Sequence, residues 1–230
     1  MTALLIATRN AHKAGEIRAI LGDGLRYLTL DDFPDAPKVV EDAHTFAGNA
    51  TKKAVELAQW MARSHESRIT NHESRFFVLA DDSGLEVDAL NGAPGVHSAR
   101  FAALESAANS ADARNNAKLL GLLKDVPSEK RAARFRCVLA LTPLISDKVE
   151  SASPVCYADE FEMQTELFEG ACEGRIGFAP LGQGGFGYDP LFLPDGFSQT
   201  FAELGEEMKN RFSHRARALA KLKGWLEKTG

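Results

Sequence analysis

Two adjacent carboxylates follow a short apolar segment in the first half of the chain. Asp81 and Asp82 come directly after residues 76–80, which we expect to form a buried strand. Ser83 and Gly84 come next and predict a turn. Because two neighbouring carboxylates are costly to bury, a hard cation such as Mg²⁺ is the usual remedy. The segment therefore predicts a metal or catalytic site, with a helix cap or a polar turn as the alternative.

A polar segment near the N-terminus has the composition of an anion site. It lies between a strand expected at 4–7 and a helix expected over 10–21. Backbone N–H groups at the start of a helix attract anions, and a lysine and small polar side chains strengthen such a site. The same residue types also serve as ordinary helix caps, so both interpretations stay open. The candidates are Thr8, Arg9, Asn10, Ala11, His12 and Lys13.

The long amphipathic helix expected over 45–62 brings further charges to consider. Glu41 precedes this helix, and Asn49 and Lys53 lie in its first turns. Taken alone, such residues indicate dipole partners and a solvated helix face. They become candidates for a site only in combination with the other polar segments.

A glycine-rich segment in the last quarter of the chain predicts a ligand loop. Four glycines occupy six positions over 182–187, which permits close approach of the backbone to a ligand. Phe186 would stack on a flat ring, and Asp189 would accept a hydrogen bond. The alternative is a tight hairpin with Phe186 in the core.

A cationic cluster precedes the last helix. Ser213 is a good N-cap, which places His214 and Arg215 in the first turn of a helix over 214–228. Cations there oppose the helix dipole, and such a local conflict often marks function. Lys209 lies just before, and these side chains would supply donors to a base carbonyl or a phosphate.

Composition narrows the classes of protein. The 230 residues suffice for one large domain, 1–230, or two closely joined lobes, and the net charge of −5 argues against a general nucleic-acid surface. The three cysteines show no metal or disulfide spacing, which suggests a reducing compartment. No apolar run is long enough for a bilayer and no leader is evident. We therefore expect a soluble, cytoplasmic protein.

Alternating strands and helices predict an α/β fold with a mixed sheet flanked by helices. Further helices are expected over 111–123, with Ser110 as N-cap, and over 201–209. A central strand is expected at 135–141, and two shorter strands between 163 and 178. Residues 65–75 and 146–162 are polar and predict exposed connections.

In their order along the chain, these segments resemble the inosine triphosphate pyrophosphatase family, which hydrolyses non-standard purine nucleoside triphosphates. The resemblance extends over nearly the whole chain, although Arg9 stands where many relatives carry glycine. The matching residues are Thr8, Asn10 and Lys13, Glu41, Phe46, Asn49, Ala50, Lys53 and Ala54, 80–85, 92–96, 98–100, 184–190, Lys209 and 213–215.

The resemblance implies an elongated, two-lobed α/β fold with a substrate cleft between the lobes, and a homodimer. It implies Mg²⁺-dependent hydrolysis of a nucleoside triphosphate to the monophosphate and pyrophosphate. Asp82 is then the general base and, with Glu41, a metal-site residue. The triphosphate would lie on 8–13, Lys53 and Ser83. The base and nearby groups would be enclosed by Phe186, Gly187, Tyr188, Asp189, Lys209, His214 and Arg215.

Other classes of protein fit the sequence less well. A nucleotide-binding regulator without turnover would retain Phe186 and His214 but lose the carboxylates of the metal site. A septum-inhibitor-type pyrophosphatase would act on different bases, and the ending at 213–215 disfavours it. A phosphatase with an aspartyl nucleophile would carry two aspartates separated by one residue, which 81–83 does not provide.

Overall fold

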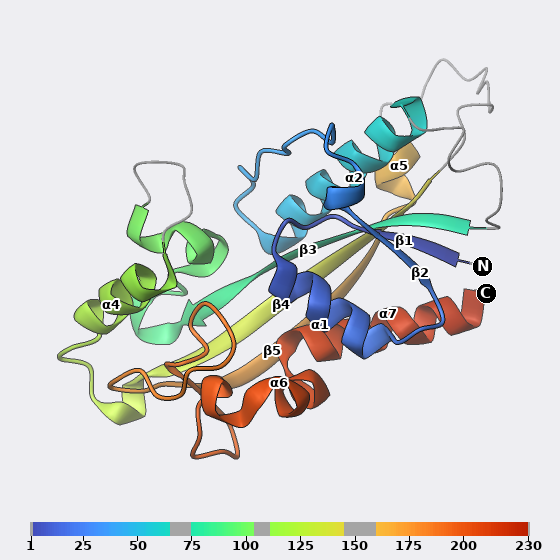
Figure 1. Ribbon diagram of the computed structural model, residues 1–230. Coiled ribbons are helices and arrows are strands. Elements are labelled where there is room, and N and C mark those ends of the chain that lie inside the picture. Colours follow the sequence, from blue (N-terminus) through green and yellow to red (C-terminus); the bar gives the residue numbers. More distant parts are fainter. Residues whose placement is uncertain (1, 65–74, 104–110, 145–159, 230) are drawn as a thin grey trace. The chain divides into compact units, whose positions relative to one another are not determined.

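The computed structural model describes residues 2–64, 75–103, 111–144 and 160–229 (Figure 1). The connections predicted at 65–75 and 146–162 lie largely outside these residues, although 160–163 form a short helix. None of the helices in the described ranges combines the length and apolar character needed to span a membrane.

Six strands form one mixed sheet, which confirms the predicted α/β class. Their order across the sheet is β2-β1-β3-β4-β5-β6. β1 pairs in parallel with both β2 and β3, whereas β5 and β6 are antiparallel. The strands are β1 (Thr2–Ile6), β2 (Arg26–Thr29), β3 (Arg75–Val87), β4 (Ala132–Pro143), β5 (Glu166–Ile176) and β6 (Phe192–Pro194).

The predicted helices are present with small shifts at their ends. The α-helices are α1 (Ala11–Leu21), α2 (Phe46–Ser64), α4 (Asp112–Leu122), α5 (Glu160–Met163), α6 (Phe201–Phe212) and α7 (His214–Thr229). Short 3-10 helices are η1 (Leu30–Asp32), η2 (Asp88–Leu90), η3 (Gly95–Ala103) and η4 (Ser128–Lys130). Ala111, not Ser110, occupies the N-cap position of α4, and it makes no side-chain capping bond.

Two predictions about the strands were wrong, and two strands, β2 and β6, were not predicted. The turn expected at Ser83 and Gly84 does not form, because β3 continues through both residues to Val87. The alternation of buried residues beyond Gly84 supports this longer strand. The two strands expected between 163 and 178 are the single strand β5, and β6 was not predicted. At three residues, β6 is too short to produce a periodic signal.

The chain divides into two compact units, and three strands contribute to both. The first unit comprises 1–82 and 138–168, and the second comprises 83–137 and 169–230. The boundaries therefore fall within β3, β4 and β5. The assignment of 1–230 as a single domain stays a prediction.

In the first unit, the strand order determines which face each helix covers. The chain steps from β1 to β2 through α1, then returns past β1 to β3 through α2. Parallel connections are right-handed, so steps in opposite directions place their helices on opposite faces of the sheet. The β3 residues that face α1 are thus separated from those that face α2.

The second unit has its own apolar core, in which helices α6 and α7 pack against the sheet. Phe135, Phe192 and Phe201 are buried together, with ring centroids 4.8 Å apart for the first two and 5.2 Å for the last two. Gly170 of β5 lies so close to α7 that an added Cβ would overlap the backbone at His214 and Ala218. A glycine is therefore required where this strand meets the start of the last helix.

Candidate functional site

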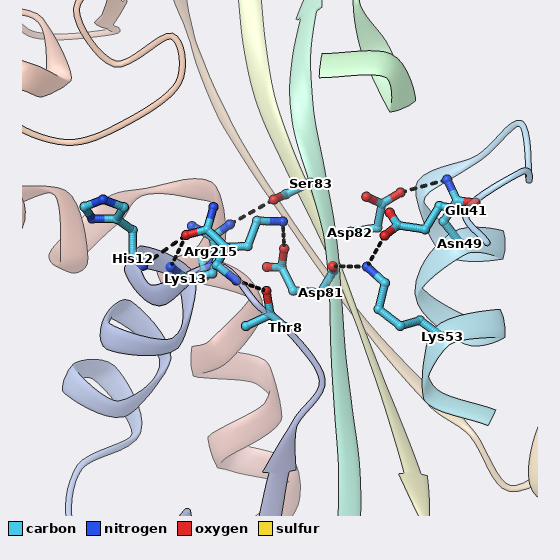
Figure 2. A network of polar contacts seen from close by, with 11 residues as sticks. Thr8, His12, Lys13, Glu41, Asn49, Lys53, Asp81, Asp82, Ser83 and Arg215 are labelled. Carbon is cyan, nitrogen blue, oxygen red and sulfur yellow. Dashed lines mark hydrogen bonds and ion pairs between the residues drawn. The ribbon is translucent and has the colours of Figure 1, made fainter. Parts of the chain in front are cut away.

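The two adjacent aspartates point to opposite faces of β3. Figure 2 shows Asp81 directed toward Lys13 and Asp82 directed toward Asn49. Successive residues of a strand alternate in this way, and the two faces are those covered by α1 and α2. The interpretation of Asp81 and Asp82 as one shared carboxylate pair is therefore corrected, because the continuous strand separates them.

Asp81 is an ion-pair partner on the α1 face. Its carboxylate is almost fully buried and binds the Nζ atom of Lys13, whose side chain is 17% exposed. The turn before α1 is ordered by its own side chains. Asn10 caps α1, with Oδ1 accepting from the N–H of His12 at 3.0 Å and of Lys13 at 3.2 Å, and Thr8 Oγ1 accepts from Asn10 N at 3.1 Å. Lys13 is thereby held in one place beside the end of β1.

The other candidates of the N-terminal segment are less enclosed. Arg9, Ala11 and His12 are exposed. The guanidinium of Arg9 donates to the carbonyl of Ala36 at 3.2 Å. That contact directs Arg9 toward the segment after η1, so the side chain of this unusual residue is engaged elsewhere in the structure.

Asp82 lies on the α2 face with a different set of partners. Asn49 Nδ2 donates to Asp82 Oδ2 at 3.1 Å, and the Oδ1 of the same amide accepts from Ala43 N at 2.9 Å. Lys53 Nζ lies 3.1 Å from Glu41 Oε1 and donates to the carbonyl of Asp81 at 3.2 Å (Figure 2). Two carboxylates, one lysine and one amide are thus gathered at a single point of the first unit.

Burial raises the pKa of Asp82 from the usual 3.8 to about 6. Lys13, Lys53 and the hydrogen bond from Asn49 act in the opposite direction, whereas the charge of Glu41 raises the pKa further. A carboxyl group with a pKa close to neutrality is suited to accept a proton during a reaction. Such strongly shifted groups concentrate at functional sites.

Glu41 and Asp82 also fit a divalent cation. Their charges repel each other, as the pKa of Asp82 shows, and a cation would relieve that repulsion. No cluster of three or more potential metal ligands occurs within the described ranges. Mg²⁺, however, is commonly held by one or two carboxylates together with phosphate oxygens of a substrate. The donor set therefore matches this ion bound jointly with a phosphate ligand.

The glycine-rich segment of the second unit forms a polar cluster around Phe186. Asp189 Oδ2 accepts from Phe186 N at 3.0 Å and from Lys209 Nζ at 2.6 Å, and Asp189 and Lys209 are both buried. Lys209 Nζ also lies 4.4 Å from the centre of the half-buried Phe186 ring. The ring is neither a core residue of a hairpin nor fully exposed, and a cation covers part of its face.

The cationic cluster before the last helix is buried in the same unit. Ser213 Oγ accepts from Ala216 N at 3.2 Å, which confirms its role as the cap. His214 stacks on Phe135, with ring centroids 4.8 Å apart. The guanidinium of Arg215 donates to Ser83 Oγ at 2.8 Å and lies 6.0 Å from the Phe186 ring. Arg215, Ser83 and Phe186 are therefore brought together.

Two residues of the sequence motifs have roles that the sequence did not assign. Asn49 joins Asp82 to the segment that carries Glu41, as described above. Ser98 Oγ accepts from Leu85 N at 2.9 Å, and its carbonyl accepts from the hydroxyl of Tyr188 at 2.9 Å. Ser98 thus links β3 to the glycine-rich segment. Both lie within motifs of the family resemblance, which was the available signal.

Comparisons with known proteins cover nearly the whole chain. A model of the Ham1 family matches residues 4–225. The dITP/XTP pyrophosphatase of Geobacter sulfurreducens is 47% identical, covering 98% of each chain. The dITP/XTP pyrophosphatase of Geobacillus kaustophilus is 44% identical, covering 100% of this chain and 97% of its own. A HAM1 protein structure from Coxiella burnetii aligns with a TM-score of 0.77 at 32% identity, covering 99% of this chain and 100% of its own.

Proposed function

Since the chain belongs to the Ham1 family, we propose that it hydrolyses dITP, XTP and ITP to the monophosphate and pyrophosphate. This reaction removes non-standard purine nucleotides from the nucleotide pool. The observation that supports it best is the buried Asp82, whose pKa is raised to about 6 beside Glu41 and two lysines. Hydrolysis of a phosphoric anhydride needs such a base for the attacking water, together with positive charge for the phosphates.

In this proposal, Asp82 acts on the attacking water. Its carboxylate accepts a proton as the water oxygen bonds to the α-phosphorus, and the bond from that phosphorus to the oxygen bridging to the β-phosphorus breaks. Pyrophosphate leaves with the negative charge. Lys13 and Lys53 would stabilise phosphate oxygens, together with N–H groups of 8–13 and the hydroxyl of Ser83. Glu41 and Asp82 would hold Mg²⁺, which supplies further positive charge to the phosphates.

The second unit supplies donors for the base. Hypoxanthine and xanthine carry an oxygen acceptor at position 6, where adenine carries an amino donor. Arg215 and His214 would donate to that oxygen, and Phe186 would stack on the ring. An adenine would offer its amino donor to these buried donors in place of an acceptor, and each hydrogen bond lost in this way costs about 1–3 kcal/mol. Lys209 and Asp189 hold the stacking residue in place.

The oligomeric state and the cellular location of the protein are also part of this proposal. We expect a homodimer, as the family resemblance implies, and a cytoplasmic location, as the odd number and the spacing of the three cysteines suggest. Light scattering on the purified protein measures its molar mass in solution. The mass of a single chain would contradict the homodimer.

Release of pyrophosphate from a panel of nucleotides tests the activity. We expect release from dITP, XTP and ITP in the presence of Mg²⁺, at least about 100-fold slower release from ATP, and none with a chelator. Binding of dITP without release from any triphosphate would instead favour a regulator that does not turn over its ligand. Release of pyrophosphate only from triphosphates with standard bases would favour a pyrophosphatase of different specificity.

Replacing Asn49 with leucine should slow turnover by about 10- to 100-fold, as is typical for residues that orient a catalytic or metal-binding group. The change removes the hydrogen bond from Asn49 that lowers the pKa of Asp82. It also removes the hydrogen bond that Ala43 N donates to the Asn49 side chain. The acid limb of the kcat profile should therefore move to higher pH. Lys52→Gln, which breaks only the exposed pair with Asp42, is the matched control. Equal rates for the two variants would contradict this role.

A further inference from the structure

The loop that carries Phe186 is also held by helix α4, on the side of Gly187. Gly187 N donates to Asp112 Oδ2 at 2.6 Å, and Gly187 O accepts from Asn116 Nδ2 at 3.1 Å. Both backbone polar groups of one residue are thus bound by one helix. None of the sequence motifs pointed to Asp112 or Asn116.

The geometry of this contact is specific. Residues 112 and 116 are one helical turn apart and lie on the same face of α4. Gly187 has φ of 64°, in the left-handed region that a residue with a side chain rarely adopts. One face of α4 therefore presents an acceptor and a donor, and the backbone of Gly187 is turned to meet both.

Helix α4, which holds the loop, is itself bound to η3 by side chains. Asn115 Oδ1 accepts from Ala102 N at 2.8 Å, and Lys118 Nζ donates to Phe101 O at 2.6 Å, so two side chains join α4 to η3. The same 3-10 helix accepts the hydroxyl of Tyr188 through Ser98. Tyr188, the residue after Gly187, is thus bound to η3, the same element to which α4 is bound.

We propose that Asp112 and Asn116 are positioning residues that place the Phe186 ring for the purine base by holding Gly187. This inference rests on the proposed function, because it assumes that Phe186 stacks on the base. On one side of the peptide between Phe186 and Gly187, the Asp189 carboxylate accepts hydrogen bonds from Phe186 N and from Lys209. On the other side, α4 holds Gly187. Loss of the α4 contacts would leave the ring tethered on one side only, and base affinity would fall.

Binding of deoxyinosine monophosphate and of inorganic pyrophosphate to the full chain tests the proposal. The monophosphate carries the base but has no anhydride to hydrolyse, and pyrophosphate lacks the base. For Asp112→Ala we expect about tenfold weaker binding of the monophosphate, and for Asn116→Leu about fivefold, from the usual strength of such hydrogen bonds. Asp112→Asn can still accept from Gly187 N and should restore affinity to within about threefold. Pyrophosphate binding should stay within about twofold of wild type in all variants, because no base is involved.

Glu129→Ala, which removes an exposed carboxylate of the same unit, is the control. Monophosphate binding by Asp112→Ala equal to that of the control would overturn the proposal. So would equal weakening of pyrophosphate binding, since that indicates general loosening of the fold.

Hydrogen exchange at the Gly187 amide gives a second readout that needs no ligand. It should accelerate in Asp112→Ala and not in Asp112→Asn, and equal exchange in the two would also overturn the positioning role. Failure of the wild type to cleave dITP would contradict the proposed function instead, and the exchange measurement would still decide the role of α4.

Discussion

Replacing Asp82 with asparagine should abolish turnover of dITP and stabilise the metal-free protein. The amide has nearly the same shape and can still accept from Asn49, but it cannot take a proton from water. We expect kcat to fall by at least about 1,000-fold, which combines loss of the base with loss of a metal-site carboxylate. Binding of dITP should persist, because the groups assigned to the base and most of those assigned to the phosphates are unchanged.

The gain in stability follows from the pKa of the same carboxyl group. Its pKa rises from 3.8 to about 6 on folding, so the folded state holds the proton more tightly. The cost of burying the charge is therefore absent below about pH 4, grows as the pH rises toward 6, and is complete above that value. The difference between the two pKa values corresponds to about 3 kcal/mol.

Urea unfolding in the presence of a chelator measures this effect. Asp82→Asn should be more stable than wild type by about 3 kcal/mol at pH 8, and the two should converge near pH 4. Asp31→Asn, an exposed aspartate of the same unit, should leave the free energy of unfolding unchanged. A destabilised Asp82→Asn at pH 8, or near-normal kcat, would refute the assignment of Asp82 as a buried catalytic base.

Replacing Lys209 with methionine should be the most destabilising of the single changes considered. Lys209 and Asp189 are each 2% exposed at the side chain, with Nζ and Oδ2 2.6 Å apart. Removal of one partner leaves the other charge buried, which typically costs about 3–5 kcal/mol. Because Lys209 also covers the Phe186 ring, nucleotide affinity should fall as well.

A double-mutant cycle tests whether Lys209 and Asp189 contribute to stability as a pair. Lys209→Met combined with Asp189→Asn removes both charges, and it should recover most of the lost free energy of unfolding, because no buried charge remains. The asparagine can still accept from Phe186 N. Additive losses in the double variant would show that the pair does not act as a unit.

The sequence was most informative where periodicity and local chemistry agreed. The helices that begin at Ala11 and Phe46 follow from their apolar spacing, and Asn10 was recognisable as a cap. The continuation of β3 through Ser83 and Gly84 was not predicted, because both residue types favour turns and only the pairing of the strand overrides them. The opposite directions of Asp81 and Asp82 depend on that continuation.

The site residues were identified less by spacing than by their joint resemblance to a family. Asn49, Ser98 and Asp112 act through contacts with residues 33, 90 and 75 positions away, respectively. Contacts between residues so far apart leave no local pattern in the sequence. The same is true of the burial that raises the pKa of Asp82, since it depends on how the helices cover the sheet.

The opposed aspartates of β3 limit how this gene can change. Insertion or deletion of one residue within the strand before Asp81 would exchange the faces of both carboxylates. Asp81 would then point toward Asn49, and Asp82 toward Lys13. Substitutions can accumulate singly in this strand, but a change in its length would disrupt both contacts at once. Variation in length should therefore be confined to the connections between elements.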